Sequence, residues 1–237
     1  MTIDICFSPA LYPFYAGNND KIVVVVDIFR ASTTMCTALK NGAKSIIPVA
    51  SIDEAQEYKK KGYLVGAERN VRRCDFADFG NSPFDYTLEK VKDKDIVFTT
   101  TNGTQAIEKA ADCFCLIVGA FSNIQSVAEF CLSHKKDVIV LCAGWNNRFN
   151  IEDSLYGGAL AELLLSGGYS SASDSTIVTL DMWKSAKSNI KSYINKTEHI
   201  KRLESNNLQK DADYCLELNT ANLIPIYNKD TKELTIL

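Results

Sequence analysis

Short runs of apolar residues alternate with amphipathic segments along most of the chain. The runs cover residues 3–7, 22–27, 45–49, 63–66, 96–100, 114–119 and 138–143 and are rich in Val and Ile. Near-continuous apolar strands are typical of a sheet that is covered on both faces. Because helical patterns separate the runs, the sequence predicts an α/β fold with three layers, α/β/α, around a largely parallel or mixed sheet.

The pattern changes after residue 165. The segment 166–175, SGGYSSASDS, is small and polar, and it is the candidate for a subdomain edge within an otherwise single domain spanning residues 1–237. Apolar residues then recur at steps of three and four from Ile177 to Tyr193, which predicts one long helix. A short helix over 198–208 and two C-terminal strands joined by an Asn-Lys-Asp turn complete the expected elements.

Three polar loops directly follow predicted strands. They read DIFRAST from residue 27, TTTNGTQ from residue 99 and CAGWNNRFNIED from residue 142. Ligands of open α/β sheets bind at the carboxyl ends of the strands, so these loops are the predicted site. The first loop begins with Asp27 after four consecutive valines, and a carboxylate there is costly unless it is paired or coordinated.

Composition and charge narrow the functional classes. The chain has 237 residues and a net charge of −3, which argues against a general nucleic-acid or membrane-surface binder. We see no signal peptide and no run near the roughly 20 apolar residues of a membrane span. The eight cysteines form no CxxC pair, so we expect reduced thiols in a cytoplasmic protein. Cys113 and Cys115 make a poor metal pair without a nearby His.

The arginines are few and concentrated. Six arginines stand against twenty lysines, and the five in predicted loops are Arg30, Arg69, Arg72, Arg73 and Arg148. Arginine suits planar, bidentate recognition of phosphate and carboxylate, so this placement predicts a small, strongly anionic ligand. The alternative is that each arginine ties down a loop carboxylate, as Arg30 could do with Asp27.

Other residues in these loops suit phosphate and metal binding. TTTNGTQ offers hydroxyls, a backbone that can approach closely at Gly103, and helical N–H groups for an anion, although a Thr/Asn/Gly turn into a helix is more often an ordinary cap. Asp27, Glu68, Glu152 and Asp153 supply the oxygen ligands that Mg²⁺ prefers. For Glu152 and Asp153, the dipole of the helix that they begin is an alternative explanation. The chain has no GxSxG motif and no histidine cluster, which disfavours triad hydrolases.

Five motifs follow one another along the chain: VVVDIFRASTT, GAERN…DFGNSP, TTTNGTQA, CAG…F..ED…G and EHIKRL…DADYC…IP. In this order they resemble the 2-phosphosulfolactate phosphatase family, the magnesium-dependent phosphatase of coenzyme M biosynthesis, along nearly the whole chain. The resemblance implies a single α/β domain of the family's own three-layer type, a Mg²⁺ cofactor and a small anionic phosphoester substrate. The implied reaction is hydrolysis of (2R)-2-phospho-3-sulfolactate to 3-sulfolactate and phosphate.

The residues and the resemblance together give a set of expected roles. The expected catalytic residues are Asp27, Arg30 and Glu68, the metal ligands are Asp27, Glu152 and Asp153, and the substrate-binding residues are Arg69, Asn81, Ser82, Thr100, Asn102, Gly103, Thr104, Arg148 and His199. One departure affects the substrate: after Glu68 and Arg69 the family tends to have glycine, where this chain has NVRRC. A phosphatase for another small phosphorylated hydroxy acid, or a catalytically silent anion-binding module, is the alternative function.

The mechanism and the assembly stay open at this level. Phosphorus could be attacked by water or by Asp27 itself, which would form an aspartyl-phosphate. Asp27 is not part of a DxDxT motif, which favours water. The sequence does not give the oligomeric state, and a homodimer is compatible with it.

Overall fold

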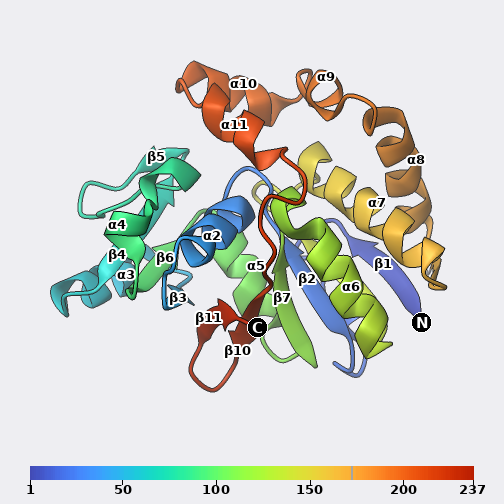
Figure 1. Ribbon diagram of the computed structural model, residues 1–237, viewed down its shortest axis with the longest axis horizontal. Helices are drawn as coiled ribbons and strands as arrows, with labels where there is room; N and C mark the ends of the chain where they lie inside the picture. The colour runs from blue at the N-terminus through green and yellow to red at the C-terminus, as the bar shows by residue number, and fades with distance from the viewer. Residues whose placement is uncertain (172) are drawn as a thin grey trace.

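A computed structural model describes residues 1–171 and 173–237 and contains one mixed sheet (Figure 1). Its strands lie in the spatial order β5 (Arg72–Arg73), β4 (Leu64–Arg69), β6 (Asp95–Thr99), β3 (Ser45–Pro48), β11 (Glu233–Ile236), β10 (Pro225–Asn228), β7 (Cys115–Gly119), β2 (Ile22–Val26), β8 (Val138–Cys142), β1 (Thr2–Cys6) and β9 (Ser170–Ser171).

The sheet consists of two parallel halves joined by the C-terminal hairpin. Strands β4, β6 and β3 are parallel to one another, as are β7, β2, β8 and β1. Strands β10 and β11 pair antiparallel, and each also pairs antiparallel with the neighbouring half, β10 with β7 and β11 with β3. The last residues of the chain therefore hold the two halves in one sheet.

Helices cover both faces, so the three-layer α/β architecture is confirmed. The helices are α1 (Pro13–Ala16), α2 (Ala31–Lys40), α3 (Ile52–Lys60), α4 (Leu88–Val91), α5 (Gly103–Ala110), α6 (Ile124–His134), α7 (Ile151–Ser166), α8 (Asp174–Ala186), α9 (Ile190–Ile194), α10 (Glu198–Ser205) and α11 (Gln209–Cys215), with short 3₁₀ turns at Pro83–Asp85 and Phe121–Asn123. In the β2 half, alternate residues face opposite cores. Val24 and Val26 pack with α6 and α7, and Val23 and Val25 pack with α2 and α5.

The seven strands expected from apolar runs are confirmed within a few residues, as is the C-terminal hairpin. The expectation of one long helix after residue 175 is wrong. Helix α8 ends at Ala186, and α9 begins at Ile190 because the Asn189 side chain accepts a hydrogen bond from the Ser192 N–H (2.9 Å) and caps a new helix.

Two further segments bear on the expected layout. Helix α11 was not expected and follows the confirmed short helix α10. Between α7 and α8, the polar segment 166–175 contains the edge strand β9; its residue 172 lies outside the described residues, and the subdomain edge stays a prediction. No helix within residues 1–171 and 173–237 has the length and apolar character needed to cross a membrane.

Candidate active site

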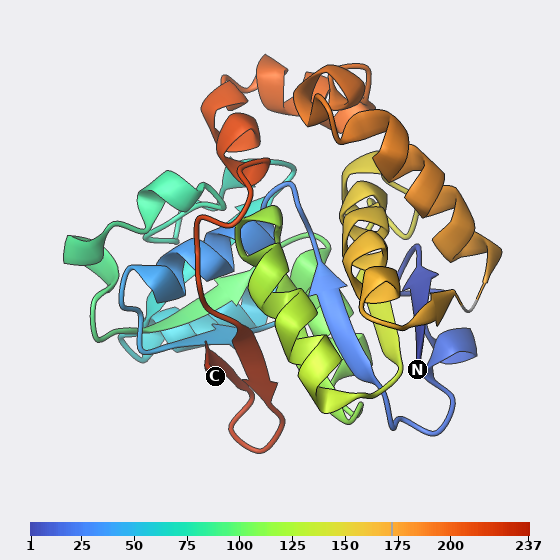
Figure 2. The same ribbon diagram turned by 45° about the vertical axis from the view of Figure 1, so that its right-hand side comes forward.

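The carboxyl ends of β2, β4, β6 and β8 meet beneath the helical arm that runs from α8 to α11 and arches over the sheet (Figure 2). A narrow cleft lies there, formed by loops from both halves of the sheet and by α10. It is lined by Asp27, Phe29, Arg30, Glu68, Val71, Asn81, Thr100, Thr101, Asn102, Trp145, His199 and Leu203. The structure thus brings together seven of the residues that the sequence predicts for the site: Asp27, Arg30, Glu68, Asn81, Thr100, Asn102 and His199.

Asp27 sits at the buried end of β2. Its backbone N–H donates to Ser32 Oγ (2.8 Å), and the residue is only 8% exposed. A Cβ atom at Gly103 would lie 2.8 Å from Asp27 Oδ2, which explains why α5 begins with glycine. Burial raises the pKa of Asp27 well above its usual range, and the neighbouring carboxylates of Asp153, Glu68 and Glu152 raise it further. The site therefore favours a positive charge beside this carboxylate.

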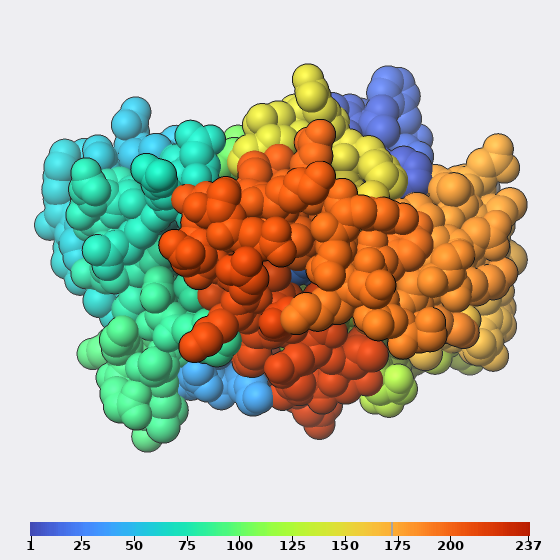
Figure 3. Space-filling view, turned by 90° about the horizontal axis from the view of Figure 1, so that it is seen from above, coloured from blue at the N-terminus to red at the C-terminus, as the bar shows by residue number. Residues whose placement is uncertain are grey.

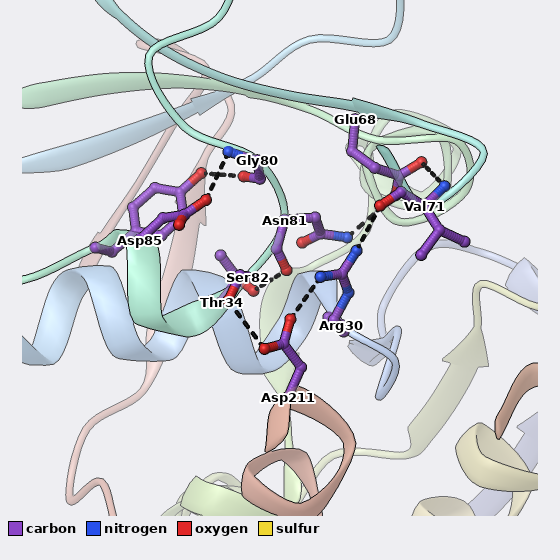
Figure 4. Close-up of polar contacts among 10 residues, drawn as sticks. Arg30, Thr34, Glu68, Val71, Gly80, Asn81, Ser82, Asp85 and Asp211 are labelled. Atoms are coloured by element: carbon purple, nitrogen blue, oxygen red, sulfur yellow. Dashed lines mark hydrogen bonds and ion pairs between the residues drawn. The ribbon is translucent and has the colours of Figure 1, made fainter. Parts of the chain in front are cut away.

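Arg30 is anchored from two sides (Figure 4). Its Nη1 donates to Asp211 Oδ2 on α11 (2.5 Å), and its Nη2 donates to the Val71 carbonyl oxygen (3.1 Å). Ser82 Oγ donates to the other oxygen of Asp211 (3.0 Å). The alternative that Arg30 ties down Asp27 is wrong, because its carboxylate partner is Asp211. Within the described chain, Arg30 Nε is buried and has no hydrogen-bond partner.

Glu68 organises the turn between β4 and β5. Its Oε1 accepts from the Val71 N–H (3.2 Å) and from Thr101 Oγ1 (3.0 Å), and its Oε2 accepts from Asn81 Nδ2 (3.3 Å). Asn70 and Val71 both have positive φ, 53° and 73°, as a type I′ hairpin turn requires. Such a φ is a genuine outlier for a β-branched residue. The departure from glycine in NVRRC therefore falls on a turn whose backbone holds both Glu68 and Arg30.

Glu152 and Asp153 begin α7 but have different surroundings. Glu152 Oε1 pairs with His199 Nδ1 (2.5 Å) and accepts from Asn150 Nδ2 (3.2 Å), whereas its buried Oε2 has no partner within the described residues. Asp153 accepts from two backbone N–H groups, those of Ile28 (2.8 Å) and Gly144 (3.2 Å). Burial and the charge of Glu152 raise the pKa of Asp153 to about 7, while these hydrogen bonds oppose the shift. Asp153 thus links the loops after β2 and β8.

The remaining predicted residues lie around the cleft rather than in its lining. Arg69 donates to the Glu68 carbonyl oxygen (2.6 Å) and to Thr99 Oγ1 (3.0 Å), and it lines a neighbouring hollow. Thr104 Oγ1 donates to the Thr100 carbonyl oxygen (3.3 Å) and so fixes the start of α5. Arg148 lines a separate hollow beside Trp145, and Arg72 and Arg73 are exposed on β5.

The acidic residues fit a magnesium ion chemically, although residues 1–171 and 173–237 contain no ready cluster of three His, Cys, Asp or Glu side chains for a metal. Glu152 offers a buried, unpartnered Oε2 among the described residues, and the Asp27 carboxylate has a strongly raised pKa. Mg²⁺ takes one or two protein carboxylates and keeps several waters or substrate oxygens. Asp27 and Glu152 are thus the better candidates, because both oxygens of Asp153 already accept hydrogen bonds.

Sequence reasoning missed three contributors to the site. Asp211 holds Arg30, Trp145 forms part of the cleft wall, and the Val71 backbone connects Arg30 with Glu68. A signal for Asp211 was available, because it opens the DADYC segment of the fifth motif. The Trp145 side chain and the Val71 backbone had no comparable signal, since their roles depend on loop conformation.

This chain is similar to known proteins of one family along nearly its full length. Residues 6–230 match the family model described as 2-phosphosulpholactate phosphatase. A Clostridium beijerinckii protein named "Probable 2-phosphosulfolactate phosphatase" is 36% identical over 217 residues, covering 90% of this chain and 91% of that protein. Proteins of the same name from Caldanaerobacter subterraneus (35% over 223 residues, covering 90% and 92%) and Thermotoga maritima (37% over 205 residues, covering 86% and 88%) are similarly related.

Proposed function

This chain belongs to the 2-phosphosulfolactate phosphatase family, which makes it a phosphoric monoester hydrolase, and we propose that it is magnesium-dependent and hydrolyses (2R)-2-phospho-3-sulfolactate to 3-sulfolactate and phosphate. The observation that carries the proposal is the juxtaposition of buried acidic side chains with an anchored arginine at the carboxyl ends of the strands. Such a site can hold a cation and a phosphate side by side.

The phosphate-binding part of the proposal rests on donors that lack partners. Arg30 Nε and Thr100 Oγ1 are both buried and unpaired within the described residues, and both residues line the cleft. Buried donors are normally satisfied, so two unsatisfied donors in one cleft fit a ligand with several acceptor oxygens. Asp211 and the Val71 carbonyl fix the plane of the guanidinium. Arg30 therefore binds a phosphoryl oxygen without first having to order its own side chain.

The metal-binding part of the proposal rests on the acidic residues. Asp27 and the free oxygen of Glu152 would hold Mg²⁺, and His199 would fix the orientation of Glu152 through its 2.5 Å contact. An Mg²⁺ ion held by these two carboxylates would neutralise the charge that develops on the phosphoryl group. Glu68 positions Asn81 and Thr101 along the cleft wall by accepting their hydrogen bonds. Attack by water is the favoured route, with a phosphorylated Asp27 as the alternative.

The substrate carries a phosphate, a sulfonate and a carboxylate on three carbons, which suits a site lined with arginine and hydroxyl donors. The reaction would be a step of coenzyme M biosynthesis. All eight cysteines are free thiols in the described chain, which fits the reducing cytoplasm as its setting.

A phosphate-release assay tests the proposal. The purified protein is assayed with phosphosulfolactate, 2-phospholactate and phosphoglycolate, each with Mg²⁺ and with EDTA. We expect phosphosulfolactate to have the highest kcat/KM, and EDTA to abolish turnover. Asp27→Asn should be inactive, while Asp75→Asn, which alters an exposed carboxylate, should match wild type.

Full activity after exhaustive chelation would overturn the metal assignment, and equal turnover of all three esters would overturn the substrate assignment. Rapid acid quench with labelled substrate distinguishes the two routes. A trapped, hydroxylamine-sensitive phosphoenzyme that Asp27→Asn lacks would replace attack by water with attack by Asp27.

A further inference from the structure

A second hollow adjoins the catalytic cleft. It lies between the loop from β8 to α7, which holds Trp145, Arg148 and Phe149, and the part of the helical arm at α10, where Lys196 precedes the helix and Arg202 lies within it. In Figure 3 the yellow segment and the orange arm that carry these elements lie side by side. The hollow and the cleft share Trp145 and His199 in their linings. A ligand small enough for the cleft can therefore extend along this common wall toward the hollow.

Three cationic residues line this hollow, and the ammonium of one of them, Lys196, lies 4.1 Å from the centroid of the Tyr193 ring. Among the described residues, Arg148, Lys196 and Arg202 form no ion pair within 4 Å, whereas Arg30 is paired with Asp211. The acidic side chains in the lining are Glu198 and Glu152, and Glu152 already contacts a histidine. A protein of net charge −3 thus keeps three positive charges together beside its active site. Such a surface attracts anions.

Arg202 is the most constrained of the three. Its guanidinium carbon lies 4.2 Å from the centroid of the Trp145 ring, a cation–π contact that orders the group. Its Nε is buried and has no partner in the part of the chain that the structure describes. An ordinary surface arginine would hydrogen-bond this N–H to water. The buried, unpaired N–H therefore fits a donor to a bound ligand.

We propose that this hollow binds the sulfonate of the substrate, one of its two anionic groups that are not transferred, and that Arg202 is a specificity-determining residue for that sulfonate. The inference rests on the proposed function for the identity of the substrate. The physical reason is that a planar guanidinium held against an indole ring can donate in-plane N–H groups to two oxygens of an oxyanion. Arg148 and Lys196 add attraction from the exposed rim.

Kinetics on two substrates tests the assignment. Arg202→Gln should raise KM for phosphosulfolactate by about tenfold to a hundredfold with kcat nearly unchanged, which is the loss expected for one or two hydrogen bonds to a charged group. KM for 2-phospholactate, which lacks the sulfonate, should change less than about threefold. Lys201→Gln, an exposed neighbour on the same helix, is the matched control. Equal losses on both substrates would overturn the specificity role.

A binding experiment tests the hollow even if phosphosulfolactate is not the substrate. Trp183 is the only other tryptophan, so in a Trp183→Phe background the fluorescence reports on Trp145. We expect iodide to quench Trp145 more strongly than caesium at equal ionic strength, and methanesulfonate to protect it saturably, both effects being lost in Arg202→Gln. No saturable protection, or protection by acetate but not by methanesulfonate, would overturn the sulfonate assignment.

Discussion

Replacing Asp211 with alanine removes the carboxylate that neutralises Arg30 and should be among the most damaging single changes in this protein. The two side chains are 5% and 3% exposed and are joined by a 2.5 Å contact. Removing one partner of a buried ion pair leaves an uncompensated charge and costs about 3–5 kcal/mol. Ser82 Oγ would also lose its acceptor. We therefore expect Asp211→Ala to lower the free energy of unfolding by roughly 3–5 kcal/mol.

A double-mutant cycle isolates the pair itself. Arg30→Met should destabilise the protein by a similar amount, and the double variant Arg30→Met/Asp211→Ala should lose less than the sum, with a coupling of about 2–3 kcal/mol. Urea denaturation followed by circular dichroism gives each free energy by linear extrapolation. Asp20→Ala is the matched control, because Asp20 pairs with Lys136 at 2.6 Å on the surface, with side chains 53% and 32% exposed. That variant should lose about 1 kcal/mol or less.

The same variants report on function. Asp211→Ala should lower kcat/KM by on the order of 10²-fold, because Arg30 is then free to leave its fixed plane. Two results would refute the reasoning. One is an Asp211→Ala variant that loses less than about 1 kcal/mol, and the other is a double variant whose loss equals the sum of the single losses.

Three further predictions follow from the cleft. Asp27→Asn should be folded, inactive and at least as stable as wild type without metal, because an expensive buried charge is gone; unchanged Mg²⁺ affinity by calorimetry would contradict its ligand role. Gly103→Ala places a Cβ 2.8 Å from Asp27 Oδ2 and 2.9 Å from the Ala31 Cβ, so it should lose about 1–3 kcal/mol by urea denaturation, as overpacking does, together with most activity. Asp153 has a pKa of about 7 against an ordinary 3.8, so the folded state binds this proton more tightly than the unfolded state. The free-energy cost of ionising the buried Asp153 carboxyl is therefore absent at low pH and grows as the pH rises. In EDTA the wild-type Tm should fall between pH 4 and 7, and Asp153→Asn should reduce the slope of that fall.

Local sequence determined the strands and the edge of the sheet where the site lies. Apolar runs such as 22–27 are specified by their own composition, so their strands were predictable within a few residues. Polar residues directly after those runs must lie at the carboxyl end of the sheet, which is why Asp27 and Thr100 could be placed in the site. The identities of a few neighbouring residues are therefore enough to predict these strands and the polar residues at their carboxyl ends.

Only the tertiary structure decided how distant segments combine. The C-terminal hairpin reads as two ordinary strands, yet it pairs with β7 and β3 and joins the halves of the sheet. Arg30 and Asp211 are 181 residues apart in sequence, so no local pattern links them, and the nearby Asp27 was the natural but wrong partner. The β4–β5 turn holds Val71 at a φ of 73° while its backbone bonds to Glu68 and Arg30. Local preference opposes that conformation, and long-range contacts can hold it because folding selects the lowest total free energy rather than the best choice at each residue.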